Sequence, residues 1–163
     1  MRPLSLSDRV QWGELWTAYL AFYETSRPKS LFDTYFARLL GDDPQDYKGL
    51  VAETDGKLVG LTHYVFHRHG WKVENVCYLQ DLYADPSVRG QGVGRKLIEA
   101  VYSAADAAGC PSVYWLTQDS NAQARKLYDR IGKLSPFLKY ERGRVCCAAS
   151  FCPLSLRLSR VHL

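Results

Sequence analysis

The sequence predicts a mixed α/β fold, because some segments carry apolar residues with the period of a strand and others with that of a helix. Two apolar runs at 50–54 and 57–66 are separated by Asp55-Gly56, a dipeptide typical of tight hairpin turns. Residues 95–108 instead place apolar side chains three and four positions apart, which indicates a helix with one buried face. Segments of both kinds in one chain of 163 residues predict a single domain with one core.

Two helices are expected before the hairpin. Aromatic residues and leucines recur at helical spacing over residues 12–23, and Ser7-Asp8 can cap that helix. A second helix begins at residues 30–33 and can end at Gly41.

The remaining elements follow the hairpin in a regular order. They are a long strand at 73–84, the helix at 95–108 that Gly109 can close, a buried strand at 113–117, a helix after the capping-box sequence Ser120-Asn121-Ala122-Gln123, and a strand at 137–142. Residues 144–163 contain no acidic side chain and are expected to form either an extra strand or a poorly ordered tail.

A glycine-rich segment, Val88-Arg89-Gly90-Gln91-Gly92-Val93-Gly94-Arg95-Lys96, lies between the strand at 73–84 and the helix that follows it. Its three alternate glycines lack the Cβ atoms that would keep a ligand away from the backbone. The start of the helix leaves N–H groups unpaired and attracts phosphate, and the three basic side chains add positive charge. We interpret the segment as a pyrophosphate-binding loop; the alternative is a turn that only joins strand to helix.

The spacing of this loop differs from two other phosphate-binding patterns. A dinucleotide-binding fold uses Gly-x-Gly-x-x-Gly with an acidic residue about 20 positions further on. A Walker loop ends in Gly-Lys-Ser/Thr. The chain instead has Arg-x-x-Gly-x-Gly over Arg89, Gly92 and Gly94.

The composition is that of a soluble protein. Apolar residues make up 47% of the chain, but no run approaches the ~20 apolar residues of a membrane span, and the first residues lack the apolar core of a signal peptide. Five cysteines without a Cys-x-x-Cys pair argue against a disulfide framework or a zinc knuckle. Cys77 and Cys110 are therefore expected to be core residues of a protein in the reducing cytoplasm.

Charge is distributed unevenly along the chain. Residues 1–88 hold 9 basic and 12 acidic side chains, whereas residues 89–163 hold 12 basic and 5 acidic ones. The basic half suits a polyanionic cofactor, and the acidic half could attract a cationic amine. A nucleic-acid-binding domain is an alternative, but the basic residues follow the phosphate loop rather than an aromatic platform.

The segment from Leu79-Gln80-Asp81-Leu82-Tyr83 to Gly94 resembles the acetyl-CoA-binding segment of the GNAT family of N-acetyltransferases. Asn121 followed seven residues later by Tyr128 resembles that family's second signature, and Tyr114-Trp115-Leu116-Thr117 lies between the two. The resemblance covers roughly residues 50 to 142. It implies a GNAT domain over residues 1–143, with a central mixed, mostly antiparallel sheet flanked by helices on both faces.

The resemblance also implies how acetyl-CoA would bind. The backbone of residues 82–84 is expected to pair with the pantetheine arm like an extra strand, the glycine-rich loop to hold the pyrophosphate, and Asn121 to hydrogen-bond the pantetheine. A cap at the start of the last helix is the alternative role for Asn121. The full set of expected cofactor-binding residues is Leu82, Tyr83, Ala84, Arg89, Gly90, Gln91, Gly92, Val93, Gly94, Arg95 and Asn121.

Acetyl transfer to an amine sets a clear chemical requirement. A lysine-like amine with a pKa of about 10.4 is neutral only about once in 2,500 molecules at pH 7, a cost of roughly 4.6 kcal/mol. A thiol with a pKa of about 8.5 is already a tolerable leaving group. By the resemblance, Tyr128 protonates the departing sulfur; the alternative is that Tyr128 only packs against its helix neighbours.

The amine side of the reaction is expected to involve Asp81. The family's polyamine acetyltransferases carry Leu-Glu-Asp where this chain has Leu79-Gln80-Asp81, and a glutamine cannot act as a base. Asp81 is expected to bind or orient a cationic amine, or to receive its proton through water; alternatively it caps a bulge.

Other residues are candidates for the amine site. Tyr23, Glu24 and Phe32 are substrate-binding candidates, because the first two helices border the acceptor cleft in this family. His63, His67 and His69 share strand parity and could form a metal-binding face, although we expect no metal.

These observations predict an acetyl-CoA-dependent N-acetyltransferase that acts by direct attack of a small cationic amine or amino acid. No cysteine lies within the two signatures, which favours direct transfer over a covalent enzyme intermediate. The alternatives are a lysine acetyltransferase of a basic protein and a non-catalytic acyl-CoA sensor. We expect a cytoplasmic homodimer that binds neither nucleic acid nor membranes.

Overall fold

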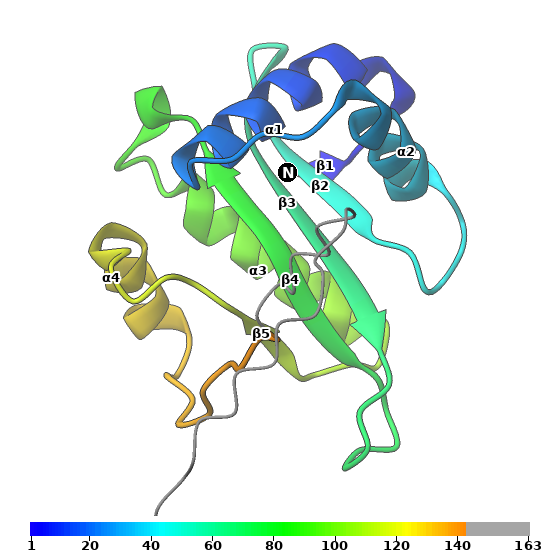
Figure 1. The fold of residues 1–163 in the computed structure, drawn as a ribbon, viewed down its shortest axis with the longest axis vertical. Helices are drawn as coiled ribbons and strands as arrows, with labels where there is room; N and C mark the ends of the chain where they lie inside the picture. The colour runs from blue at the N-terminus through cyan, green and yellow to red at the C-terminus, as the bar shows by residue number, and fades with distance from the viewer. Residues whose placement is uncertain (143–163) are drawn as a thin grey trace, which may run out of the picture. The chain divides into compact units, whose positions relative to one another are not determined.

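The computed structural model describes residues 1–142, of which residues 1–133 form a compact α/β unit (Figure 1). Its sheet has the strand order β1-β2-β3-β4-β5 and is antiparallel except for the β4–β5 pair. The strands are β1 (Arg2–Pro3), β2 (Lys48–Thr54), β3 (Lys57–His67), β4 (Val76–Ala84) and β5 (Val113–Trp115). The helices are α1 (Arg9–Phe22), α2 (Lys29–Leu40), α3 (Val93–Ala107) and α4 (Ala122–Ile131), with short 3-10 turns at Leu6–Asp8 and Pro86–Val88.

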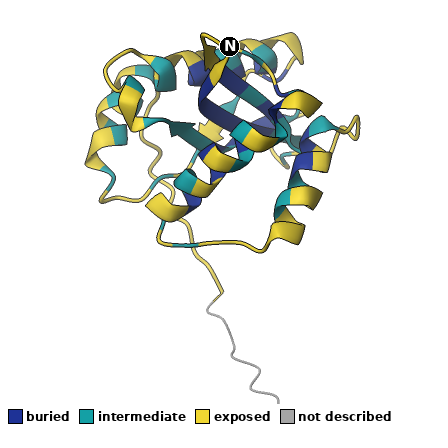
Figure 2. Ribbon diagram, turned by 90° about the horizontal axis from the view of Figure 1, so that it is seen from above, coloured by how far each residue is buried: buried dark blue, intermediate teal, exposed yellow. Residues whose placement is uncertain are grey.

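The sheet separates two hydrophobic clusters. Helices α1 and α2 cover one face of the sheet and α3 covers the other (Figure 1). The central strands are the most deeply buried part of the unit (Figure 2). The first cluster is rich in aromatic residues from α1 and α2 around Trp12, which is fully buried. The second joins Ile98 and Val101 of α3 to Cys77 and Leu79 of β4. The predicted mixed sheet with helices on both faces is confirmed.

The β2–β3 hairpin forms where the sequence predicts it. Asp55 and Gly56 both adopt left-handed conformations, with φ of 51° and 75°. A two-residue turn with positive φ at both positions matches the twist of the strands it joins. The local turn chemistry therefore fixes the position of this hairpin.

A β-bulge interrupts the pairing of β3 with β4. His63 pairs with Asp81 and Tyr64 pairs with Leu79, so Gln80 is an extra residue in β4. Because successive side chains of a strand point to opposite faces, the extra residue changes the face on which the following side chains lie. Asp81 thus shares the α1/α2 face with His63, whereas Leu79 packs on the α3 face.

Among residues 1–142, no strand pairs with one edge of β4 towards its C-terminal end. The last β4–β5 pair is Leu79 with Trp115, while β4 continues to Ala84. The Asp85 N–H donates to the Val59 C=O of β3 at 2.9 Å. Because backbone groups of alternate residues face the same neighbour, the N–H and C=O groups of the odd-numbered residues at this end of β4 face β3. Leu82 and Ala84 are the even-numbered residues between them, and their backbone N–H and C=O groups therefore face the unpaired edge.

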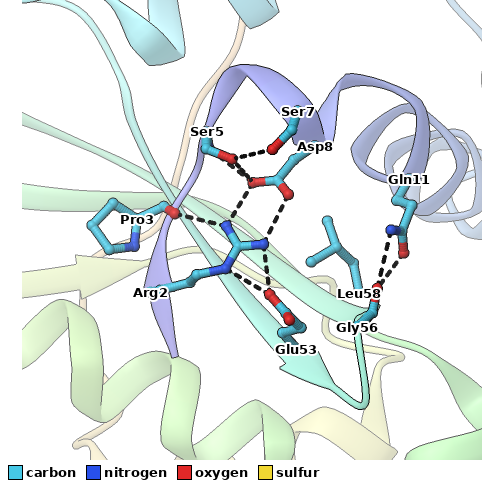
Figure 3. Close-up of polar contacts among 9 residues, drawn as sticks. All are labelled: Arg2, Pro3, Ser5, Ser7, Asp8, Gln11, Glu53, Gly56 and Leu58. Carbon is cyan, nitrogen blue, oxygen red and sulfur yellow. Dashed lines mark hydrogen bonds and ion pairs between the residues drawn. The ribbon is translucent and has the colours of Figure 1, made fainter.

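The N-terminal strand β1 was not expected from the sequence, because it is only two residues long. Arg2 ties it to the rest of the unit through two carboxylates (Figure 3). Its guanidinium donates to both oxygens of Asp8 at 2.7 and 2.8 Å and to Glu53 of β2 at 2.6 Å. The Asp8 carboxylate also accepts hydrogen bonds from the backbone N–H and the hydroxyl of Ser5. Asp8 therefore contributes to a bidentate ion pair as well as to the first turn.

Several predicted boundaries need correction. Strand β4 begins at Val76 rather than at residue 73, and α4 is capped by Asn121 rather than by Ser120. The strand expected at 137–142 is wrong, since residues 134–142 contain neither helix nor strand. These residues belong to a second unit, within which Lys139 forms an ion pair with Glu141. The expectation for residues 144–163 concerns residues that lie outside the described part of the chain.

Two further observations bear on the composition. Cys77 and Cys110 are buried free thiols, as expected for core residues. None of the helices within residues 1–142 combines the length and the apolar character needed to cross a bilayer.

Candidate functional site

The bulge in β4 creates a buried polar site on the α1/α2 face of the sheet. Asp81 is 6% exposed and the His63 side chain opposite it is completely buried. Both lie beside the aromatic cluster of α1 and α2, where a carboxylate would ordinarily be excluded. The register of the sheet, rather than local sequence, brings these two residues together.

A chain of hydrogen bonds crosses three elements at this site. The Trp12 Nε1–H of α1 donates to His63 Nε2 at 2.9 Å, and His63 Nδ1 lies 2.8 Å from Asp81 Oδ2. An indole N–H can only donate, so His63 Nε2 must accept and the imidazole proton is assigned to Nδ1. His63 therefore donates to the Asp81 carboxylate.

Tyrosine side chains surround the same carboxylate. The Tyr35 hydroxyl of α2 donates to Asp81 Oδ2 at 3.3 Å. Burial, followed by the nearby Asp81 charge, raises the pKa of Tyr19, Tyr23, Tyr35 and Tyr47 above its usual value. Four neutral phenols from α1, α2 and the segment before β2 thus lie within electrostatic reach of one carboxylate.

Asp81 lacks a cationic partner within residues 1–142. His63 is the only basic side chain there in ion-pair distance of it, and His63 serves as a neutral donor. An ionised carboxylate that is removed from water and paired only with neutral groups is costly. The site is electrostatically suited to a ligand that carries a positive charge.

Tyr128 of α4 lies within electrostatic reach of Tyr23, which is itself near Asp81. Burial, and secondarily the proximity of Tyr23, raises the pKa of Tyr128 to about 12. The Tyr128 ring packs edge-to-face on Trp115 of β5, with centroids 5.4 Å apart. Tyr128 therefore both packs against a neighbour and keeps its proton through neutral pH, as a proton donor must.

The glycine-rich loop leads into the N-terminus of α3 as the sequence predicts. Gly90 and Gly92 have φ of 79° and 75°, in the left-handed region that favours glycine. Gly92 is the cap residue and offers no side chain, and the first intrahelical bond runs from Lys96 N–H to its carbonyl. The N–H groups of the residues between them are thus left for another acceptor. Arg95 is less available than expected, since it pairs with Glu99 at 2.7 Å.

Comparison with known proteins identifies the family. The family model described as the acetyltransferase (GNAT) family matches residues 12–132. The chain belongs to the GNAT family of acetyltransferases. It is 37% identical over 144 residues to the D-amino-acid N-acetyltransferase HPA3 of Saccharomyces cerevisiae, which covers 88% of this chain and 89% of that protein. It is also 39% identical over 75 residues to the thialysine N-epsilon-acetyltransferase of Bos taurus, covering 46% and 44% of the two chains. The protein is therefore an N-acetyltransferase.

Solved structures show the same fold. The aminoglycoside acetyltransferase AAC(6′)-Iy, in complex with a CoA bisubstrate analogue, superposes with a TM-score of 0.76 at 20% identity and covers 88% of this chain and 96% of its own. The ribosomal-protein-alanine N-acetyltransferase from Brucella melitensis biovar Abortus 2308 gives a TM-score of 0.71 at 22% identity, covering 87% and 97%. At these identities the likeness concerns the fold alone.

Within this GNAT fold, Asn121 adopts the alternative role that its sequence position allowed. Its Oδ1 accepts the Ala124 N–H at 3.3 Å, and its Nδ2 donates to the Thr117 hydroxyl at 3.2 Å. Asn121 is therefore the cap of α4. Its expected contact with the cofactor remains a prediction.

The three predicted amine-site residues of the first two helical segments lie in different surroundings. Tyr23 lies near Asp81, whereas Glu24 is exposed at the end of α1 with a φ of 52°. Phe32 packs into the aromatic cluster, with its ring 4.6 Å from that of Trp16. The structure thus brings Tyr23 to the carboxylate, while Phe32 supports the surrounding core.

The sequence pattern did not reveal the roles of four residues, which are Trp12, Tyr19, Tyr35 and His63. In the sequence, Trp12 and Tyr35 are aromatic residues of helical segments, which usually indicates core positions, and His63 suggests only a metal ligand. The available signal was a polar residue in the middle of the apolar run at 57–66. The suggested metal face does not form: His63 contacts Trp12 and Asp81, while His67 Nε2 lies 3.0 Å from the Tyr114 hydroxyl. In residues 1–142 no three potential metal ligands gather.

Proposed function

We propose that this GNAT enzyme transfers the acetyl group of acetyl-CoA to a small cationic amine or amino acid. The observation that carries this proposal is the buried Asp81 carboxylate, whose hydrogen-bond partners in the described chain are all neutral. A ligand ammonium would supply the missing positive charge. The names of two relatives agree with such an acceptor, since one acts on D-amino acids and the other on thialysine.

The tyrosines around Asp81 favour an ammonium in a second way. The faces of aromatic rings attract cations, and Tyr19, Tyr23 and Tyr35 all lie near the carboxylate. His63 and Tyr35 contact Oδ2, and Tyr19 also forms a hydrogen bond with the carboxylate. Because the two oxygens of a carboxylate can accept about four hydrogen bonds, acceptor capacity is left for a bound amine. Asp81 would thereby bind the amine and lie within reach of the proton that the amine must lose.

The donor site is proposed from two features of the backbone. The unpaired edge of β4 offers the N–H and C=O groups of Leu82 and Ala84 to a pantetheine arm. The uncapped start of α3 offers N–H groups to a pyrophosphate, with Arg89 beside them in sequence. A protein of the same fold, AAC(6′)-Iy, is described in complex with CoA, which supports this proposal.

Transfer would proceed by direct attack of the neutral amine on the thioester carbon. Asp81, directly or through water, would receive the proton that the ammonium gives up. Tyr128 would donate its hydroxyl proton to the sulfur as the carbon–sulfur bond breaks, because its raised pKa keeps it protonated. The second proton that the nitrogen loses after its attack would then restore the neutral Tyr128 hydroxyl. The buried thiols of Cys77 and Cys110 are not part of the proposed site, so we propose no covalent enzyme intermediate.

We further propose that the enzyme works in the cytoplasm as a homodimer. The two free buried thiols are consistent with a reducing compartment. Size measurement by light scattering at several protein concentrations tests the dimer directly.

The test of the function is acetyl-CoA-dependent thiol release across an acceptor panel. The panel holds polyamines, amino acids of both hands, thialysine, lysine-rich peptides and aminoglycosides, each paired with an analogue in which a hydroxyl replaces the amine. CoA binding is measured separately by calorimetry. We expect turnover with one class of small amine and none with its hydroxyl analogue.

Other outcomes would contradict the proposal. Turnover with lysine-rich peptides alone would identify a protein acetyltransferase. CoA binding without turnover of any acceptor would identify an acyl-CoA sensor. An absence of CoA binding would show that the assignment of the donor site is wrong.

A further inference from the structure

We infer that His63 is a positioning residue for Asp81 and that Trp12 fixes the tautomer in which His63 acts. The inference rests on the proposed function, in which Asp81 binds the amine. Neither His63 nor Trp12 contacts the amine in this account; both act through the carboxylate.

The geometry places the three groups in one uninterrupted chain. Trp12 comes from α1, His63 from β3 and Asp81 from β4, and their exposed fractions are 0%, 0% and 6%. The two links measure 2.9 Å from Trp12 Nε1 to His63 Nε2 and 2.8 Å from His63 Nδ1 to Asp81 Oδ2. Both ring nitrogens of His63 are therefore engaged, and each neighbour constrains the other.

The chemistry of the chain excludes a proton-shuttle role for His63. A shuttle would accept a proton at one ring nitrogen and release it at the other, but His63 Nε2 is occupied by a donor that cannot accept. Protonation of Nε2 would leave the buried indole N–H of Trp12 without a partner, which is costly. His63 is thus held as a fixed N–H donor towards Asp81.

Fixing this donor has a defined effect on the carboxylate. His63 and Tyr35 both bind Oδ2, and the Tyr35 ring also packs edge-to-face on the His63 ring at 5.1 Å. Together with the hydrogen bond from Tyr19, these contacts set the rotation of the carboxylate that the amine meets. The other titratable groups near Asp81 are Tyr19 of α1, Tyr23 directly after α1, and Tyr47, and all three keep their protons at neutral pH.

Two substitutions of His63 separate positioning from packing. In His63→Asn, the amide nitrogen lies close to where imidazole Nδ1 was and can still donate to Asp81, whereas His63→Leu fills the space without a donor. We expect His63→Leu to lower kcat/KM for the amine about 10- to 100-fold, the value of a hydrogen bond to a charged group, and His63→Asn to recover most of it. The dissociation constant of CoA should be unchanged in both. The same fall in both variants, or a parallel loss of CoA binding, would overturn the positioning role.

The tautomer is read without turnover, from the imidazole ¹⁵N shifts of the full-length protein. We expect Nδ1 of His63 to carry the proton and Nε2 to be bare, and Trp12→Phe to abolish this fixed pattern. A proton on Nε2 in the wild type would overturn the inference. Failure of the wild type to acetylate any acceptor would instead contradict the proposed function, so the two failures are distinguishable.

Discussion

Tyr128 is the residue on which leaving-group chemistry depends in this account. Its hydroxyl must hold a proton at neutral pH and release it to a sulfur, and burial next to Tyr23 raises its pKa to about 12. The group therefore stays in its acid form over the whole physiological range. Because a thiolate is already a tolerable leaving group, the assistance should be moderate rather than absolute.

We expect Tyr128→Phe to lower kcat by about 10²-fold, the lower end for general acid catalysis, with little change in the affinity for CoA. The ring and its contact with Trp115 are retained, so packing is preserved. Steady-state kinetics with the best acceptor of the panel measures the effect. Tyr114→Phe, on an exposed tyrosine of β5, is the matched control. An unchanged kcat would show that Tyr128 only packs.

At the scale of elements, the functional strand β4 depends on a glycine in its neighbour. A Cβ on Gly60 of β3 would lie 2.9 Å from the Tyr83 carbonyl and 3.1 Å from side-chain atoms of Leu97 and Val93. The close approach packs β4 and the start of α3 together. The same packing therefore supports both the unpaired β4 edge and the glycine-rich loop that leads into α3.

Gly60→Ala should destabilise the protein by about 1–3 kcal/mol, as overpacking of a well-filled core does. Because the displaced atoms belong to β4 and α3, we also expect weaker binding of CoA. Urea unfolding and calorimetry measure the two effects. Gly70→Ala is the control, since no heavy atom would lie within 4 Å of its new Cβ. Equal stability of the two variants would contradict the close packing.

The elements differ in how far the sequence determines them. The Asp55-Gly56 turn and the loop around Gly90 and Gly92 are local, so their chemistry alone predicts their conformations. The bulge at Gln80 is not local, because it depends on the pairing of His63 with a residue 18 positions away. The pattern of apolar residues within either strand does not specify how the two strands pair.

The site residues differ in the same way. The sequence predicts Asp81, Tyr128 and the loop, because each lies in a recognisable segment. The role of Trp12 was not predictable, since a tryptophan on a helical stripe is usually core, and only tertiary packing turns its N–H towards His63.

At the scale of the whole molecule, the ion pair of Arg2 with Asp8 makes a contribution to stability that depends on pH. The Arg2 side chain, followed by hydrogen bonds from Ser5, lowers the pKa of the buried Asp8 carboxyl from 3.8 to about 2. A carboxyl with a depressed folded-state pKa stabilises the fold above its unfolded pKa and loses that effect as the pH falls. The contribution of Asp8 should therefore disappear between about pH 4 and pH 2.

Asp8→Asn should lower the free energy of unfolding by about 1–2 kcal/mol at pH 7, a range that allows for screening of the partly exposed Arg2 by water. The difference from wild type should shrink as the pH approaches 2. Urea unfolding at a series of pH values checks this, with the exposed Asp106→Asn as control. A difference that stays constant with pH would contradict the ion-pair account.

The proposed chemistry depends on the binding of the amine by Asp81. The most direct measurement is the KM of the best amine acceptor for wild type and Asp81→Asn, with the dissociation constant of CoA measured on the same samples. We predict that KM rises about 10- to 100-fold, because a hydrogen bond to a charged group is lost, while CoA binding is unchanged. An unchanged KM for the amine would contradict the central claim and assign Asp81 a structural role at the bulge.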